Sequence, residues 1–137
     1  MGSQVDVKAT NLHGSATVDA APGTDNAGST TQIGVGTIVM SADNTTIKSA
    51  TQTLEITAIG IVTETRVASD NRPVAYTYFG WVRVMSSAAI AVGAPLRIAD
   101  GGKVVTGTLG THRIIGRALT STSDTGQILQ AFVFFGQ

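Results

Sequence analysis

The chain has 137 residues, no cysteine, and nine basic against nine acidic residues, so its formal net charge is zero. The balanced charge without a basic stripe excludes phosphate-driven binding of nucleic acid, and the absence of cysteine excludes disulfides and thiolate metal sites. No apolar run reaches the roughly 18 residues of a membrane-spanning helix, and we expect neither membrane insertion nor a secretory signal. Charged residues make up only 13% of the sequence, which suits either strand faces that pack against other subunits or a plain, sparsely charged β domain. The zero net charge favours association.

Residues 1–32 differ in composition from the rest, because they contain no aromatic residue and no isoleucine. So little apolar surface cannot offset the cost of ordering a segment on its own. We therefore predict an extended N-terminal arm over 1–32 and a β domain over 33–137. Apolar and polar residues alternate over residues 5–9, as in a short strand that pairs with a partner's exposed edge. The candidate contact residues of the arm are Val5, Val7, Ala9 and Leu12.

From Ile33 onward the β pattern is continuous, with β-branched and apolar runs separated by turn residues. The strands are expected over residues 37–41 and 46–49, 54–63, 76–85, 95–99 and 103–106, 113–121, and 127–135. Residues 67–73 are predicted to form a loop, and residues 86–92 a connector. No window longer than about ten residues keeps a helical period, so the predicted fold class is all-β.

An internal duplication runs through this β region. Residues 35–47 match residues 92–104, with Gly36 aligned to Gly93 and Asp43 to Asp100, each 57 positions further along. Both copies later end in an apolar run. The architecture predicted from this repeat is a small β-barrel or sandwich built from two related hairpin units.

The aromatic strand at 76–85 is apolar on both faces. A strand of this kind is buried on both sides, either inside a closed barrel or beneath a neighbouring subunit. Core packing is the favoured explanation, and a seam between subunits is the alternative. Arg113 and Arg117 lie four positions apart on one expected strand, so they share a face, either towards a partner's carboxylates or at a solvated edge. The candidate interface residues are Tyr76, Tyr78, Phe79, Trp81, Arg83, Arg113 and Arg117.

Residues with the spacing that catalysis requires are missing from the sequence. The histidines, His13 and His112, are far apart, and the only glutamates are Glu55 and Glu64. Asp43 and Asp100 are explained as caps of hairpin turns, and no nucleotide-binding or nucleophile motif occurs. We expect no enzymatic activity, no cofactor, no metal and no small-molecule substrate.

The second copy also carries a family resemblance. Its run over residues 91–106, followed by Ile115-Gly116-Arg117-Ala118-Leu119, resembles the capsid decoration proteins of tailed bacteriophages, also called cement or head-stabilising proteins. The residues that carry the match are Gly93, Asp100, Gly102, Thr106, Ile115, Gly116 and Ala118. The arm over 1–32 is longer than in many relatives, and the strand around Trp81 is unusually aromatic.

The resemblance implies a structural virion protein, often a homotrimer, on the capsid exterior, made in the host cytoplasm. Its partners would be further copies of itself and the major capsid protein, whose neighbouring subunits it joins against internal DNA pressure. In lambda-like relatives an N-terminal arm becomes ordered on the capsid. The alternative function is a carbohydrate- or receptor-binding β module displayed on a virion or cell surface, which an exposed Trp81 beside polar groups would favour. A third class is an accessory domain of an enzyme.

Overall fold

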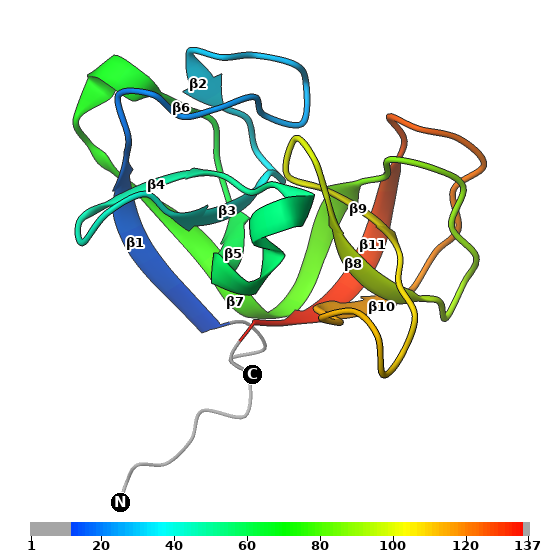
Figure 1. The fold of residues 1–137 in the computed structure, drawn as a ribbon. Coiled ribbons are helices and arrows are strands. Elements are labelled where there is room, and N and C mark those ends of the chain that lie inside the picture. The colour runs from blue at the N-terminus through cyan, green and yellow to red at the C-terminus, as the bar shows by residue number, and fades with distance from the viewer. Residues whose placement is uncertain (1–11, 136–137) are drawn as a thin grey trace, which may run out of the picture.

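A computed structural model describes residues 12–135, whose regular structure is nearly all β-strand (Figure 1). The strands are β1 (Leu12–Val18), β2 (Gln32–Ile33), β3 (Ile38–Ser41), β4 (Thr46–Ser49), β5 (Ala58–Val62), β6 (Arg66–Val67), β7 (Pro73–Met85), β8 (Pro95–Ala99), β9 (Lys103–Thr106), β10 (Gly116–Ala118) and β11 (Ile128–Phe134). Two short 3-10 helices, η1 (Gln52–Thr57) and η2 (Ala68–Asp70), complete the regular elements. The all-β prediction is confirmed.

The first half of the chain closes into a ring. β7 pairs with β1 and β5, β5 pairs with β3, β3 pairs with β4, and β4 returns to β1. The last of these pairings is parallel, with Val18 opposite Ile47. Each strand of the ring contributes one side chain to a single buried apolar cluster: Val18, Val39, Ile47, Val62 and Val74. The ring is therefore a small barrel with a filled interior.

The second half repeats this arrangement, with β8, β9, β10 and β11 in the places of β3, β4, β5 and β7. β11 pairs with the C-terminal part of β7, which takes the place that β1 has in the first half. The chain leaving β7 also closes this half, because Ser86 pairs in parallel with Val104 as Val18 pairs with Ile47. In Figure 1 the first unit lies on the left and the second on the right. β7 belongs to both units.

Backbone hydrogen bonds follow the duplication position by position. The amide of Gly36 donates to the carbonyl of Val62 at 3.0 Å, and the amide of Gly93 donates to the carbonyl of Ala118 at 2.8 Å. The two glycines have left-handed φ angles of 84° and 81°, a conformation that favours glycine. The predicted pair of related hairpin units is confirmed.

The two units share a second and larger apolar core. It contains buried side chains of both halves, among them Ile38 and Ile61 from the first and Leu96 and Leu129 from the second. The hairpin turn of the second unit also docks on the first. Gly102 there accepts a hydrogen bond from the amide of Ile38 at 2.9 Å. The units are therefore joined by packing as well as by β7.

The predicted strand over 54–63 is wrong in its first half. Residues 54–57 belong to η1, and β5 begins only at Ala58. Tertiary contacts explain the difference, since η1 bridges the two units: Glu55 accepts two hydrogen bonds of 3.1 Å from Arg97 of β8, and the amide of Gln52 donates to Asp100 at 2.9 Å. Such contacts override the β propensity of the local sequence.

Other predicted boundaries need smaller corrections. The strand expected over 113–121 shrinks to β10 at 116–118, which pairs with β11 along its whole length and with β8 at Gly116 and Arg117. The aromatic strand begins earlier than expected, at Pro73, where β1 pairs with it. The predicted loop at 67–73 contains the short η2.

The part of the predicted arm that the structure describes lies on the β domain. Residues 12–18 form β1 of the first ring. Further along, the buried carboxylate of Asp25 accepts hydrogen bonds from the amides of Ala27, Ser29 and Gly34 at 3.0, 2.8 and 2.8 Å. These bonds hold the connection from β1 to β3. Val5, Val7 and Ala9 lie outside the described residues, where the arm stays a prediction.

Replacing Gly102 by alanine tests the docking of the second hairpin turn on β3. Gly102 has a φ of 65°, and a Cβ there would lie 2.7 Å from the carbonyl oxygen of Ile38, besides overlapping the Thr37 side chain. We expect Gly102→Ala to lower the free energy of unfolding by more than about 2 kcal/mol in chemical denaturation. Gly126, with a φ of 79° and no atom within 4 Å of its Cβ position, is the matched control, for which we expect about 1 kcal/mol. Equal losses would show that the docked turn adds nothing.

Candidate interaction surface

An apolar surface on β7 and β11 is exposed to solvent. The exposed fractions are 41% for Phe79, 57% for Trp81 and 54% for Ile128. Phe132 and Phe134 are half-buried, and lie opposite Trp81 and Phe79 across the two strands. These five residues are the aromatic surface.

The prediction that the aromatic strand is buried on both faces is wrong for a single chain, within residues 12–135. Gly80 and Val84 of β7 are buried and Val82 is half-buried. Because side chains alternate along a strand, the residues between them point outward. Trp81, which core packing was expected to bury, therefore faces solvent.

The rings of the aromatic surface are held in a fixed arrangement. Phe132 meets Phe79 edge-to-face, with centroids 5.2 Å apart and planes at 83°, and it meets Trp81 in the same way at 6.0 Å and 88°. Such pairs are preferred aromatic geometries. Phe132 thus fixes both neighbours while the Trp81 side chain stays mostly exposed.

A polar pair borders the aromatic surface. Arg83 lies opposite Gln130, one step along the same face from the pair of Trp81 and Phe132. With Trp81, Val82 and Gln130, Arg83 lines a shallow hollow of about 260 Å³. Within residues 12–135 the guanidinium of Arg83 and the side-chain amide of Gln130 make no hydrogen bond or ion pair, so the hollow offers donors beside an exposed indole.

The first unit shows that the fold does not require this surface. The cross-strand pair of His13 and Thr77 takes the place of Trp81 and Phe132, because Thr77 also pairs with β5 as Phe132 pairs with β10. The next pair on this face, Ser15 with Ala75, likewise replaces Arg83 with Gln130. At these positions the first unit has one histidine and three small residues, whereas all four side chains of the second unit are large.

Tyr76 and Tyr78 do not join the aromatic surface. Tyr76 packs against the first apolar cluster and lies over Gly14 and Gly60, where a Cβ would come within 2.5 Å of its ring. Tyr78 packs against the larger core. Both tyrosines are therefore packing residues, and the glycines leave space for the Tyr76 ring.

Arg113 and Arg117 do not share a face, contrary to the sequence analysis. Arg113 precedes β10 and points inward, where it donates to the carbonyls of Ala58 at 3.1 Å and Phe135 at 2.9 Å. Burial lowers the pKa of its guanidinium. Arg117 is exposed on β10 and donates to the carbonyl of Gly93 at 3.2 Å. Only Arg117 is available to a partner in solution.

Leu12, the last of the predicted contact residues of the arm, is the first residue of β1. It pairs with Phe79 at the start of β1. β1 therefore begins beside Phe79 of the aromatic surface. The pairing of β1 with β7 brings Leu12 next to the aromatic strand, although the two are far apart in the sequence.

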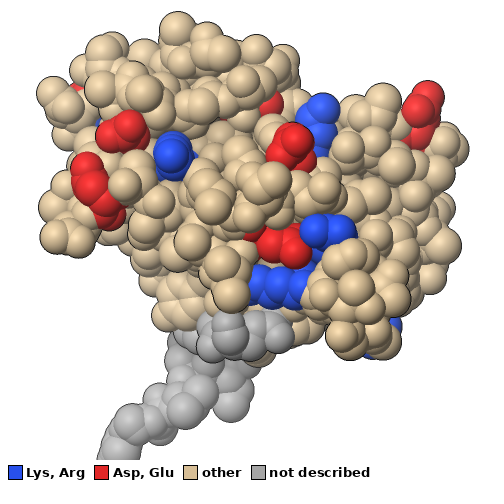
Figure 2. Space-filling model, in the orientation of Figure 1, with Lys and Arg blue, Asp and Glu red and all other residues tan. Residues whose placement is uncertain are grey.

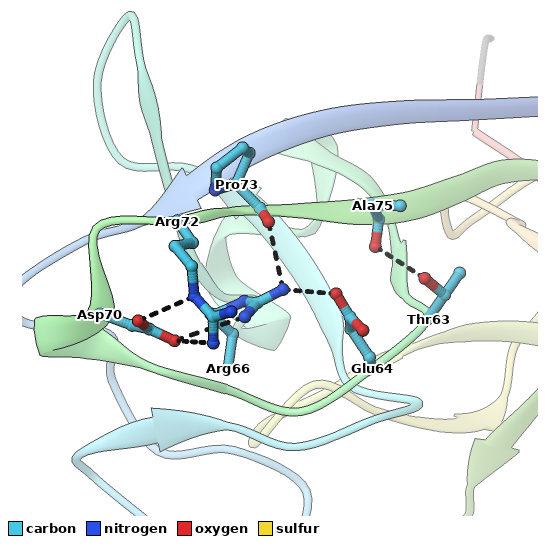
Figure 3. A network of polar contacts seen from close by, with 7 residues as sticks. All are labelled: Thr63, Glu64, Arg66, Asp70, Arg72, Pro73 and Ala75. Atoms are coloured by element: carbon cyan, nitrogen blue, oxygen red, sulfur yellow. Dashed lines mark hydrogen bonds and ion pairs between the residues drawn. The ribbon is translucent and has the colours of Figure 1, made fainter.

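A charged network holds the loop between β6 and β7 (Figure 3). Arg66 contacts Glu64, bonds to Asp70 at 3.3 Å and donates to the carbonyl of Pro73 at 3.2 Å. Arg72 makes two hydrogen bonds to Asp70, at 3.0 and 2.8 Å. The two arginines of the network are matched by two carboxylates. On the face drawn in Figure 2, acidic and basic side chains are interspersed rather than gathered into a patch of one sign. The role of the network is to hold the loop.

The two histidines have local partners. The Nδ1 atom of His13 lies 3.2 Å from the hydroxyl of Thr77, and that of His112 accepts the amide of Thr108 at 2.9 Å. No three metal-ligating side chains come together between residues 12 and 135. The helices in this range are also too short and polar to cross a membrane.

Comparison with known proteins gives a similarity in structure. No family model matches the chain, and no curated protein sequence matches it at a significant level. Among solved structures, it is similar to the crystal structure of the head fiber gp8.5 N base in bacteriophage phi29. The TM-score is 0.66 and the sequence identity 13%, over 91% of this chain and 95% of that chain. The two chains share a fold over nearly their whole lengths.

Breaking the charged network should change the titration of Asp70. Hydrogen bonds from Arg72, with a smaller part from Arg66, lower the pKa of Asp70 from its ordinary value of 3.8. Because the pKa of Asp70 is lower in the folded than in the unfolded state, the ionised carboxylate stabilises the fold at pH values above the ordinary pKa. This stabilisation is lost as the pH falls through the lowered pKa. We expect Arg72→Gln to move the pKa of Asp70 back towards 3.8, measured by carboxyl-carbon NMR titration. The control is Asp43, whose pKa is lowered mainly by the amide of Thr45 and should not change.

Proposed function

We propose that this protein is a structural component of a bacteriophage virion. It binds the outer surface of the capsid and joins neighbouring major capsid protein subunits, stabilising the shell against internal DNA pressure. The observation that carries the proposal is the fold shared with a phage head-fiber base over 91% of the chain. The sequence resemblance to capsid decoration proteins, which centres on residues 91–119, supports it independently.

The aromatic surface and the N-terminal segment together form the proposed capsid contact. The residue that follows this segment, Leu12, pairs with Phe79 of the aromatic surface. Burying an exposed aromatic side chain supplies roughly 1.5–3 kcal/mol, and an extended segment adds main-chain hydrogen bonds when it pairs with a strand edge. Contacts of this modest size are sufficient for a protein held on a shell in many copies.

A shell-binding role of this kind requires no catalysis and no cofactor. It also accounts for a low content of charged residues, 13% of the sequence, since the surface serves contacts with other subunits rather than solubility alone. We extend the proposal to a homotrimer, which the family resemblance implies.

Sedimentation of the isolated protein tests the trimer. We expect a single species of three times the chain mass of 14.0 kDa at micromolar concentration. The double variant Trp81→Ser/Phe132→Ser should stay trimeric, because the aromatic surface is proposed to contact the capsid. If the variant instead became a monomer with an unchanged circular dichroism spectrum, the aromatic surface would be the seam between subunits. A monomeric wild type that also forms no trimer on particles would contradict the trimer.

Binding to phage particles stripped of this protein tests the capsid contact. Deletion of residues 1–11 and the variant Trp81→Ser/Phe132→Ser should each lower the affinity at least tenfold while the fold is retained, by circular dichroism. The deletion must stop at residue 11, because a longer one would remove β1 and the loop held by Asp25. Ser15→Ala, on the equivalent face of the first unit, is the control and should bind normally. Unchanged affinity of both altered proteins would place the capsid contact elsewhere.

Binding of carbohydrate is the second candidate function, and one observation favours it. Trp81 is 57% exposed and shares its hollow with Arg83 and Gln130, the combination of a stacking ring and hydrogen-bond donors that sugars use. Trp81 is the only tryptophan, so its fluorescence reports directly on this site. Saturable quenching by a panel of neutral and acidic sugars, abolished in Arg83→Ala/Gln130→Ala, would favour this function, and no quenching at millimolar sugar would exclude it.

A further inference from the structure

One short motif is kept in both units. Residues 33–37 read Ile-Gly-Val-Gly-Thr and residues 90–94 read Ile-Ala-Val-Gly-Ala. Each stretch forms a turn that leads into the first strand of the hairpin, β3 or β8. We call these stretches the valine turns.

The two valine turns have the same backbone. The amide of Thr37 donates to the carbonyl of Gly34 at 3.1 Å, and the amide of Ala94 donates to the carbonyl of Ala91 at 3.2 Å. In each turn the valine precedes the glycine with positive φ and stands at the outer corner. Its exposed fraction is 56% in the first unit, at Val35, and 66% in the second, at Val92.

The fold accounts for the other retained residues of the motif but not for the valines. Ile33 and Ile90 are buried, with 0% and 2% exposed, so packing explains them. The glycines are explained by their φ angles. An exposed turn corner has no need of a β-branched apolar side chain, and residues of this type are uncommon in turns.

Two exposed positions have diverged between the units, whereas the retained exposed pair Asp43 and Asp100 is explained by the backbone amides that each accepts. On the outer face of β7, Trp81 and Arg83 stand where the first unit has His13 and Ser15. An exposed valine that stays the same in both units, while such positions have changed, indicates that both turns contact the same kind of surface. A partner with one binding site meets only one of them, whereas a lattice of identical subunits presents the same surface twice.

We propose that the Val35 and Val92 turns are two equivalent docking points, each seated in the same apolar recess of one of two neighbouring, identical capsid subunits. This rests on the proposed function and adds to it the means by which one chain bridges two subunits. The two turns are held differently from within the chain. Asn26 donates to the carbonyl of Val35 at 3.1 Å, and Arg117 donates to the carbonyl of Gly93 at 3.2 Å. Both turns are thus pre-ordered for contact, which reduces the entropic cost of binding.

The test uses Val35→Ser, Val92→Ser and the double variant on stripped phage particles. Each single variant should weaken binding by a similar factor of about ten, equivalent to one buried valine, and the double variant by about a hundredfold. At saturating protein, each single variant should still decorate the particles but give them no added resistance to heat-induced DNA release, because only one of two subunits is held. The control is Val67→Ser, an exposed valine (46%) outside the motif.

The outcomes separate this inference from the function on which it rests. If wild-type protein does not bind stripped particles, the proposed function fails. If wild type binds and both single variants bind and protect the particles as well as wild type, the valine turns are not docking points. If only one of the two variants has an effect, the equivalence fails. Val35→Thr and Val92→Thr keep the branched shape and replace the serine variants where these lower the melting temperature.

Discussion

The structure depends on one shared strand. The 13 residues of β7 are the last strand of the first unit through their pairing with β1 and β5, and the first strand of the second unit through their pairing with β11. The two halves have the same strand order, and neither is complete without β7. The duplication therefore produces one continuous domain instead of two domains joined by a linker. The larger apolar core extends across both units.

The aromatic surface follows from this sharing. The outer face of β7 and β11 belongs to the second unit, and the equivalent face of β1 and β7 belongs to the first. The same backbone thus presents two comparable faces, and only the second has acquired large exposed side chains. The pairing of β1 with β7 also brings Leu12 next to Phe79 of that face, although the two residues are far apart in the sequence.

Local patterns predicted the fold well where the signal was local. Turn residues at Asp43 and Asp100 located both hairpins, and the matched glycines at 36 and 93 revealed the duplication, because φ angles and tight turns depend on a few neighbouring residues. What failed depended on long-range contacts. Residues 54–57 have strand composition, yet the pairing of Glu55 with Arg97 holds them as a 3-10 helix. The exposure of Trp81 could not be predicted from the sequence either, because a strand that is apolar on both faces does not show which face stays uncovered.

The closure of the first ring by β1 has a consequence for how the chain acquires its structure. β1 is made first, but its antiparallel partner β7 lies some sixty residues later, and its parallel contact with β4 alone covers only two residue pairs. The first barrel cannot close until β7 is available, and β7 is stabilised in turn by β11 at the other end of the chain. Such long-range dependence slows folding and couples the two units, so neither has a separate transition. The molecule should therefore unfold in one cooperative step, with its first and last strands protected from hydrogen exchange to the same extent.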